Sequence, residues 1–258
     1  MRAGIYQHFR PEEREAIDRA SDWVERASDM PVLTPFLNPR ERYIVETVAQ
    51  GASVKFDSLP KGEYQRLLVF PDYYTPTESD FEVALLTISY PVKFYSLKHS
   101  QILGTILGET GLDRREIGDI LLSDDCAQIF VTRRLVPVLI DSVHKIAGAP
   151  VKFDEVSLNA QISVKSDETK TTILLASLRL DTFIATALKN TRNFAVNMIQ
   201  SSRVKVNYAE TTKNDLDLQP GDLVSIKGFG RLRLIEILGQ SKKNKLKVEI
   251  ATILNHKK

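Results

Sequence analysis

Residues 177–208 read SLRLDTFIATALKNTRNFAVNMIQSSRVKVNY, and this stretch decides the fold of the C-terminal third of the chain. Two apolar stripes with helical spacing follow one another in it, at Phe183–Leu188 and Phe194–Ile199, with a short polar break between them. Such spacing is typical of two short amphipathic helices in series, which can bury their apolar faces as an αα-hairpin. We expect Asp181 to cap the first helix and Thr191 to cap the second.

The residues after this hairpin predict a small sheet. Val204–Tyr208 alternates apolar and polar side chains, which is the period of a strand with one polar face. Turn signals at Pro220–Asp222 and Gly228–Gly230 separate the runs that follow. The further strands are expected at Leu223–Lys227, Arg231–Leu238 and Leu246–Leu254.

Charge is distributed unevenly along the chain. The 258 residues carry 35 Lys and Arg against 33 Asp and Glu, but residues 179–258 alone carry 15 against 7, a net charge of +8. The first 178 residues carry 20 against 26, a net charge of −6. A basic segment on an acidic body predicts a module that binds a polyanion. We expect Arg179 and Arg192 to be its principal phosphate contacts, because guanidinium groups can bind two phosphate oxygens at once.

The middle of the chain predicts a ferredoxin-like unit. Strand-like and helix-like runs follow one another in the order β-α-β-β-α-β, the split βαβ arrangement that RNA-recognition-motif (RRM) domains share. Those domains stack bases on exposed aromatic residues of the sheet, whereas Phe130 stands alone in its strand, so we expect no stacking there. The runs are Phe81–Tyr90, Ser100–Gly108, Ile117–Leu122, Ala127–Thr132, Leu135–Ile146 and Lys152–Leu158.

The first 78 residues predict a mainly helical domain with two added strands. Apolar residues recur at helical spacing over Ile17–Ala27, and Asn38 with Pro39 opens a second helix. Ala52–Phe56 and Gln65–Phe70 are strand-like. We therefore predict an α+β protein of three domains, with the middle one RRM-like. Their limits are 1–78, 79–177 and 178–258.

Composition excludes several classes of protein. The longest uninterrupted apolar run, Leu135–Ile140, is far shorter than the roughly 20 residues of a membrane span, and we expect a cytoplasmic protein. The one cysteine, Cys126, cannot form an internal disulfide. The four histidines lack the spacing of metal ligands, so no metal or cofactor is expected. They are His8, His99, His144 and His256.

The C-terminal stretch resembles the S4 RNA-binding domain. Its pattern is an RLD helix start, a second helix opened by a Ser-Arg pair, a V-x-V-N strand and a late P-G-D turn. Thr191 replaces the usual serine, and Ser202 and Tyr208 stand where glycines are common. The matching residues are Arg179-Leu180-Asp181, Thr191-Arg192, Ala195, Met198-Ile199, Val204-Lys205-Val206-Asn207 and Pro220-Gly221-Asp222.

The whole chain is similar to the YlmH family, and the run Glu109–Ile120 also matches it. The resemblance implies a non-catalytic protein that binds structured RNA, rRNA and tRNA, on the large ribosomal subunit. It further implies a role in ribosome-associated quality control of stalled translation, with a link to cell division. The RNA-binding residues are then expected to be Arg179, Thr191, Arg192, Arg203, Lys205, Asn207, Lys227 and Arg231.

Alternative interpretations remain open. Pseudouridine synthases also carry S4 modules and have a catalytic aspartate in an RLD triplet, which makes Asp181 the residue to test for an RNA-modifying enzyme. A scaffold in cell division would use the acidic first two-thirds of the chain to bind a protein partner. Arg114 and Arg115, in a predicted loop, belong either to a solvated turn or to a second RNA contact.

Overall fold

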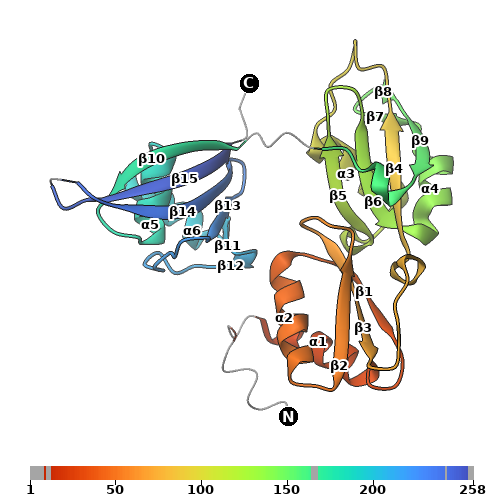
Figure 1. Cartoon of the computed structure of the whole chain (residues 1–258). Coiled ribbons are helices and arrows are strands. Elements are labelled where there is room, and N and C mark those ends of the chain that lie inside the picture. Colours follow the sequence, from red (N-terminus) through yellow and green to blue (C-terminus); the bar gives the residue numbers. More distant parts are fainter. Residues whose placement is uncertain (1–8, 10–12, 164–167, 242, 255–258) are drawn as a thin grey trace. The chain divides into compact units, whose positions relative to one another are not determined.

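The computed structural model describes residues 9, 13–163, 168–241 and 243–254, and the protein is α+β. The chain divides into two compact units, Met1–Lys165 and Ser166–Lys258 (Figure 1). In the described part of the chain, no helix is long and apolar enough to cross a membrane.

The first unit begins with two helices packed on a three-stranded antiparallel sheet of order β1-β3-β2. Asn38 caps the second helix as expected, because its side chain accepts from the Arg40 and Glu41 amides while the Glu41 carboxylate accepts from the Asn38 amide. The elements are α1 (Arg14–Arg26), β1 (Val32–Leu37), α2 (Pro39–Gln50), β2 (Val54–Leu59) and β3 (Gln65–Pro71).

Strand β1 corrects the expectation that the residues before Ala52 form only helices. Pro35 lacks an amide hydrogen and argues against a strand in the sequence. In the structure the register shifts between Leu33 and Phe36, so Pro35 lies at an irregularity in an edge strand, where proline is tolerated.

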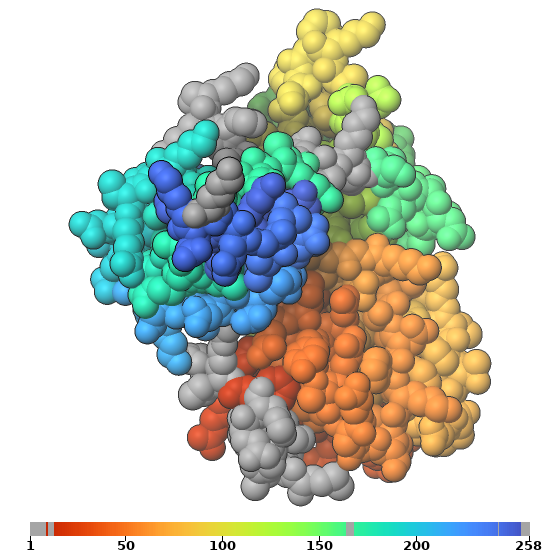
Figure 2. Space-filling model, turned by 60° about the vertical axis from the view of Figure 1, so that its left-hand side comes forward, coloured from red at the N-terminus to blue at the C-terminus, as the bar shows by residue number. Residues whose placement is uncertain are grey.

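A second, four-stranded sheet follows in the order β5-β6-β4-β9, with all neighbours antiparallel. This is the strand order of the split βαβ arrangement. Its strands and helices are β4 (Val83–Ser89), α3 (His99–Thr110), β5 (Ile117–Leu122), β6 (Ala127–Thr132), α4 (Val136–Ser142) and β9 (Lys152–Val156). The short connections are η4 (Glu78–Phe81), η5 (Arg114–Glu116), η6 (Arg133–Leu135), η7 (Leu158–Ala160), β7 (Lys145–Ile146) and β8 (Ala149–Pro150). The segment between β4 and α3 projects from the end of the sheet (Figures 1 and 2).

Helix α4 is shorter than the sequence pattern predicts. The helix expected over Leu135–Ile146 ends at Ser142, and the backbone becomes extended at Val143. Ile146 then pairs with Ala149 in the β7–β8 hairpin. Val143 and Ile146 are both buried in the core. Apolar spacing indicates which residues are buried, but it does not by itself distinguish a helix from a hairpin.

Both faces of the four-stranded sheet are covered. Helices α3 and α4 bury one face, and every residue of the central strand β6 is buried. The other face packs against residues of the β1-β3-β2 sheet in one apolar cluster, and Phe130 is 0% exposed there. The buried members of this cluster are Phe36, Leu68, Phe70, Phe81, Val83, Leu85, Leu121 and Phe130.

The second unit packs an αα-hairpin on a six-stranded antiparallel sheet of order β10-β15-β14-β13-β11-β12. The expected helices and strands after residue 177 lie close to their predicted limits. Strand β10, which the sequence places before the boundary at 177/178, pairs with β15 over its whole length and so lies in this unit. The elements are β10 (Thr169–Leu175), α5 (Leu180–Ala187), α6 (Arg192–Gln200), β11 (Val204–Val206), β12 (Ala209–Glu210), β13 (Leu223–Ile226), β14 (Gly230–Gln240) and β15 (Leu246–Leu254).

A substitution at Gly118 of β5 tests the tight contact between the two sheets of the first unit. A Cβ atom there would lie 2.7 Å from Cε1 of Phe36 and 3.0 Å from Cβ of Phe130. We expect Gly118→Ala to lower the free energy of unfolding by about 1–3 kcal/mol through overpacking. Gly104→Ala on the exposed side of α3 meets no atom within 4 Å, and we expect it to stabilise by about 0.5–1 kcal/mol. Urea unfolding followed by circular dichroism measures both, and equal effects would contradict the proposed clash.

Candidate nucleic-acid interface

Helix α5 begins differently from the sequence prediction. Arg179, not Asp181, occupies the N-cap position, and Asp181 lies in the first turn of the helix. The first amides of α5 are satisfied by the loop before β13, since Leu180 donates to the Leu216 carbonyl and Asp181 to the Asn214 carbonyl. The Asp181 side chain is therefore not needed as a cap and is available for other partners.

The Asp181 carboxylate is buried between two arginines. Its side chain is 1% exposed, whereas those of Arg179 and Arg192 are 36% and 60% exposed. Arg179 donates from Nε to Oδ1 (3.3 Å) and from Nη2 to Oδ2 (3.0 Å). Arg192 donates from Nε and Nη2 to Oδ2, at 3.0 and 2.8 Å. The structure thus brings the two principal predicted contacts together and fixes their guanidinium planes.

The charge of Asp181 is stabilised by its neighbours. Burial raises the pKa of this carboxyl, but hydrogen bonds from Arg179, Arg192 and Thr182 outweigh burial and lower the pKa to about 2. The Arg179 pKa is raised, first by its hydrogen bond to Asp181. Arginine is always protonated in proteins, so two positive charges share one negative charge, and the cluster keeps a net positive charge of one.

Helix α6 carries the second half of this cluster at its start. Thr191 is the N-cap as predicted, and its hydroxyl accepts from the Phe194 amide at 3.1 Å. Phe194 packs edge-on against Phe229 with ring centroids 5.3 Å apart, which assigns it to the core rather than to base stacking. Arg192 follows the cap directly, so its position is set by the helix start.

Four further predicted contacts line one open groove of about 580 Å³ in the second unit. Arg203 donates to the Lys227 carbonyl at 3.3 Å, and Gly228 follows with a φ of +86°, so the turn after β13 is held against the strand of Arg203. Among the residues that the structure describes, Glu210 is the one acidic residue that lines the groove, 3.6 Å from Lys205. The basic residues that line it are Arg203, Lys205, Lys227 and Arg231.

Asn207 has a structural role that the sequence does not reveal. Its side-chain amide nitrogen donates to Asp222 at 2.7 Å, and its side-chain oxygen accepts from the Leu223 amide at 2.9 Å. Asn207 and Tyr208 form the two-residue turn between β11 and β12, both with positive φ, as Ser202 also has. The two positions where glycine is common, Ser202 and Tyr208, are thus positions where the backbone is left-handed.

The predicted contacts form two clusters rather than one continuous surface. Thr191 and Arg192 lie at the start of α6, and Arg179 joins them through Asp181, whereas Arg203 follows the end of α6. Nine helical residues rise about 13 Å, so a ligand must extend over a comparable length to touch both clusters. We name these the Asp181 cluster and the basic groove.

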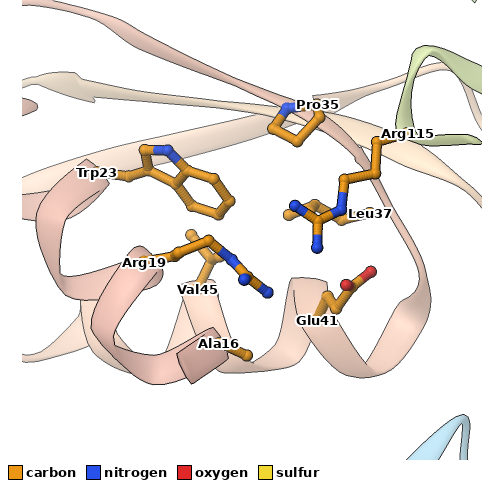
Figure 3. A pocket seen from close by; sticks show the side chains of 8 residues that line it. All are labelled: Ala16, Arg19, Trp23, Pro35, Leu37, Glu41, Val45 and Arg115. Carbon is orange, nitrogen blue, oxygen red and sulfur yellow. The ribbon is translucent and has the colours of Figure 1, made fainter. Parts of the chain in front are cut away.

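Of the two loop arginines of the first unit, Arg114 contacts other protein groups, whereas Arg115 is exposed. Arg114 lies over the Tyr64 ring, 4.4 Å from its centroid, and donates to the Ile117 carbonyl. Arg115 lines a depression with Arg19 and Trp23 (Figure 3). The cavity there is about 10 Å³, which holds at most one water molecule. This geometry favours a structural turn.

The geometry of the described residues offers little for catalysis. Asp181, the one candidate nucleophile, is buried, and its two oxygens accept from Arg179, Arg192 and Thr182. Within the described ranges, no group of three or more His, Cys, Asp or Glu side chains could hold a metal ion. His8 and His256 lie outside the described residues.

Comparison with known proteins gives three similarities. Residues 76–160 match the family model described as "Putative RNA-binding domain in YlmH". The chain is 34% identical over 255 residues to ribosome-associated protein quality control protein P2 of Bacillus subtilis (strain 168), covering 95% of this chain and 96% of that protein. It also resembles the solved structure of cell division protein ylmH from Streptococcus pneumoniae, with 36% identity and a TM-score of 0.55. That match covers 62% of this chain and all of the solved chain.

The depressed pKa of Asp181 predicts an acid-sensitive contribution to stability. The folded pKa of about 2 is lower than the ordinary value of 3.8, so the contribution is complete above about pH 4 and is lost as the pH falls through about 2. After allowance for solvent screening at the exposed arginines, we expect it to be about 1–2 kcal/mol.

Urea unfolding between pH 2 and pH 6 measures this contribution. As the pH falls from 4 to 2, the wild type should lose stability relative to Asp181→Asn. Asp141→Asn, which changes an exposed carboxyl on α4, is the matched control. A stability difference between wild type and Asp181→Asn that does not vary with pH would contradict the assignment.

Proposed function

Because the chain belongs to the YlmH family, we propose that it binds structured RNA through its second unit. The observation that carries the proposal is the Asp181 cluster. A guanidinium group has five N–H donors, and Asp181 accepts from two nitrogens of each arginine. The remaining donors of the exposed Arg192 are held in a fixed orientation, in which they can bind phosphate oxygens with a small loss of side-chain entropy.

The basic groove supports the same proposal from the other end of α6. Its four basic residues and one carboxylate give it a positive charge, and lysine and arginine side chains there can follow a sugar-phosphate backbone. An RNA that contacts both sites spans several nucleotides. We therefore assign phosphate contacts to Arg179, Thr191 and Arg192 in the Asp181 cluster. Those in the groove are Arg203, Lys205, Lys227 and Arg231. Asn207 shapes the adjoining turn.

The finer role is a proposal that the names of the relatives support in part. We propose that residues 178–258 are an S4 domain whose sheet also includes β10, that the RRM-like domain lies within residues 79–177 and ends before β10, and that residues 1–78 are a third domain. The partners are rRNA and tRNA on the large ribosomal subunit, in the cytoplasm, and the process is ribosome-associated quality control. The name of the Bacillus subtilis relative supports this process, and no catalytic step is proposed.

Loss of both clustered arginines should abolish binding. We expect Arg179→Ala with Arg192→Ala to weaken RNA affinity by more than about tenfold, because each loses a charged hydrogen bond to phosphate. Co-sedimentation of the full chain with Bacillus subtilis large ribosomal subunits measures this loss of affinity. Arg26→Ala is the matched control, since Arg26 is also an ion-paired arginine, 59% exposed.

These substitutions leave the buried Asp181 carboxylate unpaired, which can destabilise the fold. A triple variant that adds Asp181→Asn removes the charge together with its partners, so binding can be compared in a folded protein. Circular dichroism establishes the fold of each variant. Sedimentation of the folded triple variant with ribosomal subunits at wild-type levels would contradict the proposal.

The basic groove should contribute to the salt dependence of binding. Lys205→Gln with Lys227→Gln removes two phosphate contacts, so the slope of log K against log salt should become shallower by about 1.5. Fluorescence anisotropy with a labelled RNA hairpin at several salt concentrations measures the slope. The control is Lys55→Gln, a lysine on β2 with 60% exposure. An unchanged slope for the double variant would exclude the groove from the RNA contact.

One alternative has an observation in its favour. The Streptococcus pneumoniae relative is titled a cell division protein, which is compatible with a scaffold that binds a protein partner through the acidic first two-thirds of the chain. Co-purification of a protein partner that survives ribonuclease and high salt would favour the scaffold. Loss of ribosome association at moderate salt would favour RNA binding.

A further inference from the structure

The residues that match an RNA-binding family model have no exposed sheet face with which to bind RNA. Domains of this topology commonly stack bases on sheet aromatics. In the first unit, Phe130 is 0% exposed, and the face on which it lies is packed against Phe36, Leu68 and Phe70. The opposite face carries α3 and α4. Any base contact made by residues 76–160 must therefore come from a loop or an edge.

The loop between β4 and α3 is strongly exposed to solvent. Tyr90 packs against the core, and Leu97 is 6% exposed, so both ends of the loop are fixed. The six residues from 91 to 96 are all exposed, and Phe94 is 83% exposed. The Pro91 carbonyl accepts from the amides of Phe94 and Tyr95 at 3.0 and 3.1 Å, which holds a turn within this loop. The loop projects from the end of the sheet (Figures 1 and 2).

The charge of the loop favours a polyanion. Lys93 and Lys98 lie on either side of the aromatic pair, and no acidic residue occurs from position 90 to position 108. Asp124 and Asp125, in the β5–β6 hairpin, lie at the same end of the sheet, since Ile88 pairs with Ala127, but they are outside the loop itself. Exposed aromatic rings with lysines beside them match a nucleic-acid strand, whose bases stack and whose phosphates attract cations.

We propose that this loop, residues 91–98, is a second RNA contact, in which Phe94 stacks on an unpaired base and Lys93 and Lys98 bind adjoining phosphates. The inference rests on the proposed RNA-binding function and adds its substrate class, a single-stranded or unpaired segment. A fixed turn suits this role, because the ring is already held away from the core before binding.

Replacing the ring should weaken binding to single-stranded RNA. With the full chain and a fluorescein-labelled 12-nucleotide single-stranded RNA of mixed sequence, we expect Phe94→Ala to lower affinity at least about fivefold. Phe94→Trp should bind within twofold of wild type, and Phe94→Leu should lose as much as Phe94→Ala, because leucine is apolar but cannot stack. The matched control is Tyr73→Ala, which removes another aromatic ring, 74% exposed, from the connection after β3.

The outcomes separate this inference from the proposed function. Wild-type affinity in Phe94→Ala or in Phe94→Leu would overturn the stacking contact, and the second result alone would indicate an apolar contact to the RNA that needs no ring. If Phe94→Ala binds normally while the folded triple variant of the Asp181 cluster does not, only this inference fails. If wild type binds no RNA, both fail. A photo-crosslink from Phe94→p-benzoylphenylalanine to rRNA on large subunits would support the contact, and crosslinks to protein alone would overturn it.

Discussion

The buried carboxylate of Asp181 needs compensating positive charge, and this need determines how the second unit is arranged. A charge that is 1% exposed is tolerated only with close partners. Asp181 obtains them from the residue before α5 and from the first residue of α6, so one interaction joins the two helix starts. The same interaction holds Arg179 and Arg192 in position at the surface. Stability of the hairpin and presentation of the arginines are thus consequences of one ion cluster.

The first unit is governed by a different constraint, the burial of both faces of its four-stranded sheet. Phe130 and Gly118 lie where the β1-β3-β2 sheet packs closely, and this contact leaves no aromatic surface on the sheet. Function in this unit therefore depends on connections rather than on strands. The loop carrying Phe94 projects from the end of the sheet, and both its ends are fixed by buried or partly buried side chains.

Local patterns predicted much of the fold because they depend on near neighbours in the chain. The apolar stripes of α5 and α6, the caps at Asn38 and Thr191, and the strands β5 and β6 were predicted from spacing and helix-start residues alone. Strand β1 was not, because Pro35 is unfavourable in a strand except at an edge or bulge, and edge position is decided by pairing with β3. The predicted end of α4 was wrong for a related reason, because Val143 and Ile146 are buried whether they belong to a helix or to a hairpin.

For the candidate site, the sequence by itself determined which side chains carry charge and that the excess of positive charge lies in the C-terminal third. Only the tertiary structure decided that Asp181 is a shared partner of two arginines rather than a helix cap. It also gathered Arg203, Lys205, Lys227 and Arg231 into one groove and turned Asn207 toward Asp222 and Leu223. The physical reason is distance along the chain. Helix and strand periods arise from residues a few positions apart, whereas these contacts join residues 11 to 28 positions apart that meet only after the elements pack.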